Sequence, residues 1–117
     1  MQISKKNITP QLDEKIHSIL FQVLSDIKSP KSIEEFLTGL LTESEMVALS
    51  KRLAIAYYLK SGKSYEYIRD NLKVSSATIA AVQDKLSKDQ GLNAGVKQVE
   101  ADEWATDWAK KITNIFK

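Results

Sequence analysis

The range 63–88 constrains the fold of this chain more than any other part of the sequence. It holds two short runs of apolar residues that recur at steps of three or four, the spacing that places side chains on one face of a helix. Only Lys73 and Val74 are available for the turn between the two runs. The internal apolar positions are Ile68, Leu72, Val74, Ile79, Val82 and Leu86. The sequence therefore predicts a short helix, a tight turn and a second helix.

Serines stand where both of these helices need a cap. Ser64 can cap the first helix and Ser75 or Ser76 the second, because a serine oxygen accepts a hydrogen bond from the free amides of the first turn. The whole pattern is that of a helix-turn-helix, whose second helix is presented to the major groove of DNA. The alternative is a helical hairpin whose apolar spacing only builds a core.

Positive charge is concentrated around this motif. Residues 51–88 contain eight Lys or Arg and three acids, a net charge of +5, whereas residues 1–50 carry −2 and residues 89–117 carry −1. A basic block of this kind binds duplex DNA through phosphate contacts and counterion release. The charge distribution therefore favours the DNA-binding interpretation over the hairpin.

Composition removes several other functions. The chain has no cysteine, which excludes disulfides and thiolate metal sites, and its one histidine, His17, is expected to be an exposed or half-buried surface residue. No glycine-rich phosphate loop, no nucleophile with a matched base and no paired metal ligands are present, so we expect no enzyme, no metal and no cofactor. No apolar run approaches the ~20 residues of a membrane span, and the N-terminus has no apolar signal core. We expect a cytoplasmic protein without membrane contact.

The sequence before the motif predicts an all-α domain. Thr9-Pro10 opens a helix over 9–28, with threonine as cap and proline at the first helical position, and Ser29-Pro30 ends it. Its apolar stripe is broad enough to need a partner, either a second subunit or another part of the monomer. Capping boxes at Ser32 and Thr42 then predict helices from Ile33 to about Leu41 and from Thr42 to about Lys60, and Gly62 is placed to end the latter.

After the motif, the range 91–95 contains two glycines and is expected to break the helical pattern. A helix over 96–117 resumes it, and both tryptophans lie there, four residues apart. Its apolar side is formed by Ala101, Trp104, Ala105, Trp108, Ile112 and Ile115. Tryptophans at this spacing bury large apolar areas, so we expect this side to contact a second subunit or the N-terminal helix rather than form a ligand cage.

These patterns predict a single helical domain over 1–117. Within it, residues 9–28 form the N-terminal dimerisation helix, residues 33–88 the core with the helix-turn-helix at 64–88, and residues 96–117 a C-terminal amphipathic helix.

The range 36–86 resembles the Trp-repressor-like proteins, and more closely their YerC/YecD group than the tryptophan-sensing repressor. The residues that carry the resemblance are Leu41-Thr42 followed by Glu45, Leu49 and Arg52; Gly62-Lys63-Ser64-Tyr65; Ile68; and Ser75 with Ala77-Thr78-Ile79. The resemblance implies an all-helical transcriptional regulator, commonly an intertwined homodimer of the Trp-repressor type. Its two recognition helices would enter successive major grooves about 34 Å apart.

Departures from the resemblance concern the ligand and the base readout. In tryptophan-sensing members a threonine and an arginine of the central helix hold the corepressor together with a threonine and an arginine of the recognition helix. Thr42, Arg52 and Thr78 match three of these positions, but Ala81 stands at the fourth, so we expect no binding of tryptophan as corepressor. YerC/YecD relatives often have serine-arginine where this chain has Ala80-Ala81. Because arginine to guanine is the strongest common base contact, base specificity should be weak.

The predicted DNA-contact set is Lys51, Arg52, Lys63, Tyr65, Lys73, Ser75, Ser76, Ala77, Thr78, Ala80, Ala81, Gln83, Lys85 and Lys88. The sequence thus predicts a homodimeric transcriptional regulator that binds double-stranded DNA. Its binding is expected to be either sequence-specific or weakly specific. The alternative is a protein–protein interaction module on a Trp-repressor-like dimer that has lost base readout. The small residues Ala80 and Ala81 motivate it, because they permit close approach of another helix.

Overall fold

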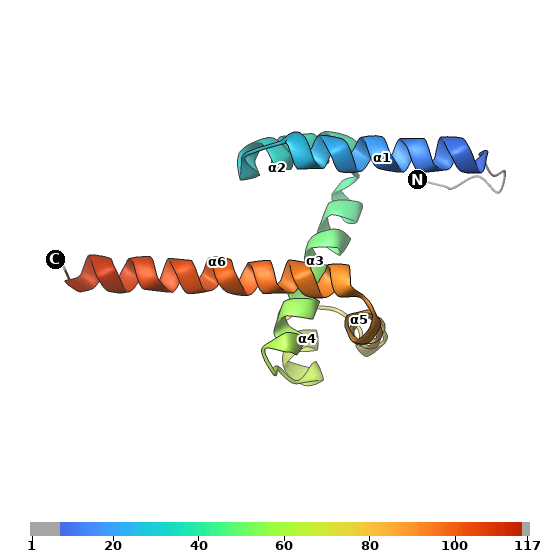
Figure 1. The fold of residues 1–117 in the computed structure, drawn as a ribbon. Helices are drawn as coiled ribbons and strands as arrows, with labels where there is room; N and C mark the ends of the chain where they lie inside the picture. The colour runs from blue at the N-terminus through green and yellow to red at the C-terminus, as the bar shows by residue number, and fades with distance from the viewer. Residues whose placement is uncertain (1–7, 116–117) are drawn as a thin grey trace. The chain divides into compact units, whose positions relative to one another are not determined.

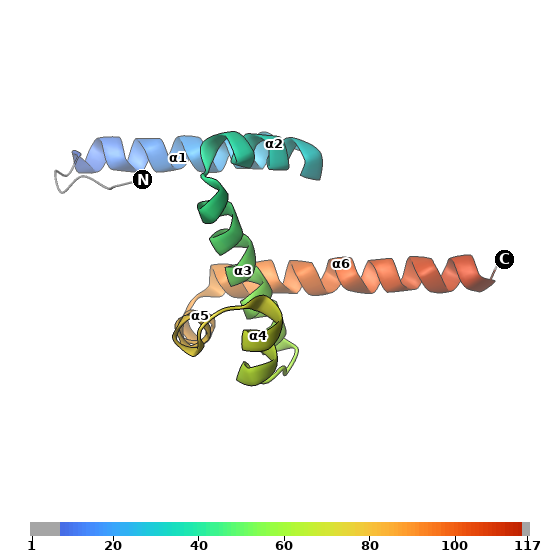
Figure 2. The same ribbon diagram turned by 180° about the vertical axis from the view of Figure 1, so that it is seen from behind.

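A computed structural model describes the backbone of residues 8–115 and the side chains of residues 8–103 and Thr106. This part of the chain contains six helices and no strand, which confirms the predicted all-α class (Figures 1 and 2). The chain divides into two compact units, residues 1–43 and residues 44–117. We call these the N-terminal unit and the C-terminal unit and describe each by itself.

The N-terminal unit contains α1 (Pro10–Asp26) and α2 (Pro30–Leu40). Thr9 caps α1 as predicted, since its Oγ1 accepts a hydrogen bond from the amide of Leu12 at 3.2 Å. The predicted start of α2 at Ile33 is wrong, because Ser29 caps it and its Oγ accepts from the amide of Ser32 at 3.1 Å. Serine followed by proline is a strong helix start, so Ser29-Pro30 takes the cap three residues before the expected box.

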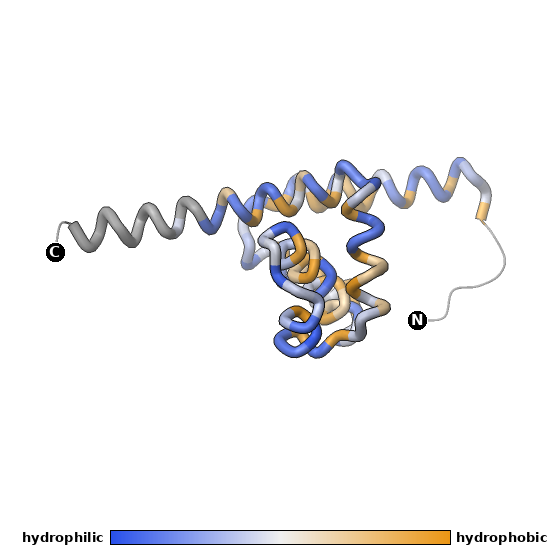
Figure 3. Tube along the Cα trace, turned by 90° about the horizontal axis from the view of Figure 1, so that it is seen from below, coloured by the Kyte–Doolittle hydropathy of each residue, from blue (hydrophilic) through white to orange (hydrophobic). Residues whose placement is uncertain are grey.

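No residue of α1 or α2 is buried. Apolar and polar residues alternate along α1 (Figure 3). Leu12, Ile16 and Ile19 lie on one side of this helix, yet their side chains are 47, 48 and 54% exposed. The N-terminal unit therefore presents an apolar face that it does not cover by itself.

The C-terminal unit consists of α3 (Glu43–Lys60), α4 (Tyr65–Leu72), α5 (Ser76–Lys88) and α6 (Gln90–Ile115). Its core consists of Ile55, Ala56, Ile68, Ile79, Val82, Leu86 and Val96. Leu72 and Val74 are half-buried against this core, so the predicted internal positions of the helix-turn-helix are confirmed. The spacing of apolar residues does not indicate Ile55 as a core residue, because α3 has apolar residues on several sides and no clear stripe.

The predicted helix caps around the turn are confirmed. The Oγ of Ser64 accepts from the amide of Tyr67 at 3.1 Å, and the Oγ of Ser75 accepts from the amide of Thr78 at 3.1 Å. Ser76 is the first residue of α5 and not its cap. With both helix starts fixed, only Lys73 and Val74 separate the end of α4 from the cap of α5.

Gly62 ends α3 as predicted and has a φ of +82°. Its amide donates to the carbonyl of Leu59 at 3.1 Å, and the amide of Lys63 donates to the carbonyl of Tyr58 at 3.0 Å. This pair of bonds is a Schellman motif, which requires a left-handed residue that glycine adopts without steric cost.

The expected break at 91–95 is wrong, because α6 begins at Gln90 and continues through both glycines. Asp89 interrupts the helix one residue earlier, where its Oδ1 accepts from the amide of Leu92 at 3.1 Å. Leu92 and Val96 then pack on the core and offset the cost of about 1 kcal/mol for each helical glycine. The prediction for the side chains of Trp104 and Trp108 falls outside the described residues.

The turn after α4 contains a strained residue. Lys73 has φ 56° and ψ 52°, which makes it the one non-glycine residue with positive φ in the described chain. A side chain with a Cβ pays a steric penalty in this region, whereas glycine does not.

We expect Lys73→Gly to raise the free energy of unfolding by roughly 0.5–1 kcal/mol, because relief of strain exceeds the extra entropy of the unfolded chain. Urea denaturation followed by circular dichroism measures this change. Lys60→Gly is the matched control, since Lys60 ends α3 with helical backbone and glycine should destabilise it. Equal destabilisation by both changes would contradict the strain at Lys73.

The Ser75 cap should be measurable in the same way. We expect Ser75→Ala to lower the free energy of unfolding by about 1 kcal/mol, because the amide of Thr78 loses its acceptor. Ser76→Ala, which removes an exposed hydroxyl at the next position, should change stability by less than about 0.5 kcal/mol. The two variants are compared by thermal and urea unfolding in the absence of nucleic acid.

Candidate nucleic-acid interface

Helix α5 has one buried side and one open side within the C-terminal unit. Ile79, Val82 and Leu86 are buried in the core. The predicted contact residues on this helix are all exposed: Ser76, Ala77, Thr78, Ala80, Ala81, Gln83, Lys85 and Lys88. The fold of the C-terminal unit therefore leaves the helix accessible along its length.

The side of α5 opposite the core carries little that can read a base. By helical spacing from Ile79, this side holds Ala77, Ala81, Asp84 and Lys88. The Nζ of Lys88 lies 3.0 Å from the Oδ1 of Asp84, so these two side chains offset each other's charge. The centre of this side of α5 therefore offers only methyl groups. These can contact a thymine methyl but donate no hydrogen bond.

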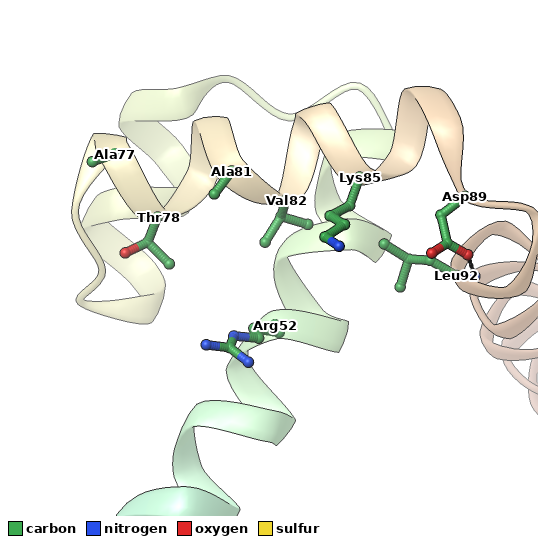
Figure 4. A pocket seen from close by; sticks show the side chains of 8 residues that line it. All are labelled: Arg52, Ala77, Thr78, Ala81, Val82, Lys85, Asp89 and Leu92. Carbon is green, nitrogen blue, oxygen red and sulfur yellow. Dashed lines mark hydrogen bonds between the residues drawn. The ribbon is translucent and has the colours of Figure 1, made fainter. Parts of the chain in front are cut away.

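One flank of α5 borders an open pocket of about 710 Å³. Arg52 reaches it from α3, and Thr78, Ala81 and Lys85 reach it from α5 (Figure 4). Ala77, Val82, Asp89 and Leu92 complete the lining. Two cations and one carboxylate at this pocket favour an anionic or polar group from outside.

Ala81, where the sequence departs from the tryptophan-sensing repressors, lines this pocket. A methyl group stands there in place of a second arginine, so a carboxylate in this pocket has one guanidinium, that of Arg52, to pair with. The hydroxyl of Thr78 is already engaged, because it lies 2.9 Å from the Oγ of Ser75. Thr42 belongs to the N-terminal unit.

The other flank of α5 carries Gln83. It borders a smaller hollow of about 150 Å³, together with Leu59, Lys60, Leu86 and Ser87. The predicted contact set is thus divided between two flanks, with Thr78 and Lys85 on one and Gln83 on the other. Lys60, which belongs to the basic block, lies beside Gln83 at this hollow.

The start of α4 carries a small aromatic cluster. The rings of Tyr58 and Tyr67 meet edge to face with centroids 5.7 Å apart. The Nζ of Lys63 lies 4.8 Å from the centroid of the Tyr67 ring, within the range of a cation–π contact. Tyr65, at the first position of α4, is 39% exposed. The contact with Tyr67 therefore holds the Lys63 side chain beside the start of α4.

Most cations of the basic block form no ion pair to a residue whose side chain the structure describes. Within the described part of the chain, Lys88 pairs with Asp84, and the Nε of Arg69 lies 3.6 Å from the Oδ1 of Asp70. No ion pair to a described residue is formed by Lys51, Arg52, Lys60, Lys63, Lys73 or Lys85. Lys51 is half-buried and the other five are exposed, so their charge is available to an external anion.

A polar contact joins α3 to α6 behind the motif. The hydroxyl of Tyr57 donates to the Oε2 of Glu103 at 2.7 Å. This hydrogen bond, together with the nearby carboxylate charge, raises the pKa of Tyr57, because both favour the protonated phenol. The contact fixes α6 against the end of α3, the helix that also supports α4 and α5.

Where side chains are described, no three of His, Cys, Asp and Glu gather closely enough to hold a metal ion. His17 is exposed, with its Nδ1 2.7 Å from the carbonyl oxygen of Asp13. No helix in the described range combines the length and apolar character needed to cross a membrane.

Comparison with known proteins agrees with this arrangement. The family profile described as "Trp repressor protein" matches residues 15–99. The chain is also 34% identical over 76 residues to "Uncharacterized protein YerC" of Bacillus subtilis (strain 168), a match that covers 62% of this chain and 73% of the relative. No solved structure matches the chain. The resemblance expected from the sequence is therefore confirmed, and the chain belongs to the Trp repressor family of helix-turn-helix regulators.

Proposed function

We propose that this chain is a DNA-binding transcriptional regulator that acts as a homodimer and inserts α5 into the major groove. The observation that carries the proposal is the open side of α5 next to cations that form no ion pair to a described residue. Phosphate contacts from such cations supply most of the affinity of a weakly specific DNA-binding protein. The candidates for these contacts are Arg52, Lys60, Lys63, Lys73 and Lys85.

We expect the chain to bind DNA mainly through phosphate contacts and to discriminate little between base sequences. The centre of the recognition helix offers Ala77, Ala80 and Ala81, and the ion pair of Asp84 with Lys88 occupies its outer end. Sequence preference then depends on Ser76, Thr78 and Gln83 at the edges and on the shape of the DNA. We therefore propose strong salt dependence and a small ratio of specific to random binding.

Dimerisation is proposed from the N-terminal unit. Its apolar face, Leu12, Ile16 and Ile19, is about half exposed, and neither of its helices has a buried residue. A second copy of the chain can cover this face symmetrically and place two α5 helices on one side of a duplex. This is also the arrangement that the family resemblance implies.

The test of DNA binding is fluorescence anisotropy of the full chain on labelled random duplex at low and high salt. We expect binding that weakens steeply with salt, and Lys63→Ala or Lys73→Ala should each flatten the log–log salt slope by about one unit. Lys97→Ala on α6 is the control that should leave the slope unchanged. Absence of binding even at low salt would contradict the proposal.

The pocket beside α5 adds one arm to this experiment. Because Ala81 replaces the second arginine, we expect millimolar tryptophan to leave the binding curve unchanged. A shift of the curve by tryptophan would show that the chain binds tryptophan without a second arginine.

The dimer is tested by a charge placed on α1. We expect Ile16→Asp to weaken self-association by on the order of 100-fold, because the carboxylate would be buried in the interface. Ser18→Asp is the matched control, since this exposed serine lies on the other side of α1. Sedimentation velocity over a concentration series measures both variants, and equal behaviour would place the dimer contact elsewhere.

A second function has a specific observation in its favour. The row of alanines on α5 permits close approach of another helix, which suits a protein-docking surface on a dimer that has lost base readout. The anisotropy experiment separates the two functions. Failure to bind duplex at low salt, with the dimer intact by sedimentation, would leave the docking function as the better explanation.

A further inference from the structure

Helix α6 continues beyond the part of the chain that the family profile matches. The match ends at residue 99, whereas the helix extends to Ile115. These 16 additional residues add about 24 Å of helix at 1.5 Å per residue. Figures 1 and 2 both show α6 running well past the other helices of the C-terminal unit. Neither the core nor the DNA-binding proposal needs this extension.

The extension has an apolar side that differs from the side packed on the core. Leu92, Val96 and Val99 lie on the side of α6 that packs on the core. Glu103 lies on the same side, where it accepts a hydrogen bond from Tyr57. At about 100° per residue, the positions of Trp104, Trp108, Ile112 and Ile115 are centred roughly 120° around the helix from Val96. Ala101 shares this second side and is exposed. By helical position, the apolar residues of the extension thus do not share the side of α6 that carries Leu92 and Val96.

Charge is divided along the extension. Residues 100–107 contain four acids and no base, and residues 108–117 contain three lysines and no acid. Two copies laid side by side in opposite directions would place each acidic half against a basic half. A parallel pair would instead place like charges together, which is unfavourable.

The N-terminal helix is a poorer partner for the same segment. Helix α1 contains Asp13, Glu14 and Asp26 but one lysine, Lys15. It therefore lacks the basic run that the acidic half of the extension requires. A second copy of the extension supplies both the apolar side and the opposite charges.

We propose that residues 100–115 of α6 pair antiparallel with the same segment of a second copy, about a two-fold axis near Trp108. Two tryptophans per copy bring roughly 600–1,000 Å² of apolar area to such a pair. This is near the lower limit of stable interfaces, so the pair reinforces association rather than causing it alone. The pairing is independent of DNA binding, and either can fail without the other.

The absence of cysteine from the chain allows a direct test by disulfide cross-linking. In an antiparallel pair centred at residue 108, position 101 lies opposite position 115. A mixture of Ala101→Cys and Ile115→Cys full-length chains under mild oxidation should give the mixed disulfide dimer at least ten times faster than either variant alone. Asp102→Cys mixed with Ile115→Cys is the matched control, because Asp102 lies on the other side of α6.

Charge variants of the extension give a second readout. Asp107 and Lys111 flank the apolar side, whereas Lys110 lies away from it. Lys111→Glu or Asp107→Lys alone should slow the 101–115 cross-link by roughly tenfold, and mixing one variant with the other should restore it. Lys110→Glu should have no such effect. Restoration in the mixture cannot come from charge pairs within one helix, because neither chain regains them.

Three results would overturn the pairing. One is rapid cross-linking of Ala101→Cys with itself, which indicates a parallel pair. Another is a 101–115 rate no greater than that of the Asp102→Cys control. The third is loss of the cross-link on Lys110→Glu to the same extent as on Lys111→Glu. Circular dichroism of each variant confirms that helix content is retained, so that a negative result is not due to unfolding.

Discussion

The burial of Ile55, Ile68 and Ile79 in one apolar core is the interaction on which the C-terminal unit depends. All three side chains are fully buried, and burying each contributes roughly 1.5–3 kcal/mol. Together they join α3, α4 and α5 in one core. Because one side of α5 is committed to this core, its other side must face solvent. The exposure of the candidate recognition helix is thus a direct consequence of where the isoleucines are.

The same arrangement separates affinity from specificity. Within the described part of the chain, Arg52, Lys60, Lys73 and Lys85 form no ion pair, so their charges are available to phosphate. The side of α5 opposite the core instead carries alanines and a neutralised Asp84–Lys88 pair. A helix of this kind can be positioned strongly on a duplex and still distinguish bases weakly. The proposed function predicts the same combination in solution, namely strong phosphate binding with weak discrimination between bases.

The helix-turn-helix could be predicted in detail because its signals are local. The Ser64 and Ser75 caps, the Gly62 terminator and the buried positions from Ile68 to Leu86 all follow from spacings within one or two turns of helix. Prediction failed where two local signals competed. Ser29 took the cap that Ser32 was expected to form, and the glycines at 91 and 95 stayed helical because Leu92 and Val96 pack on the core.

The sequence by itself determined the helices, their caps, the basic block and the family, since each depends on neighbours along the chain. Only the tertiary structure decided which surfaces those residues form. It divided the predicted contact set between the Arg52 flank and the Gln83 flank, paired Lys88 with Asp84, and bound Tyr57 to Glu103 across 46 residues. Such contacts depend on the angles at which helices cross, and those angles are set by how side chains fill the core rather than by local spacing.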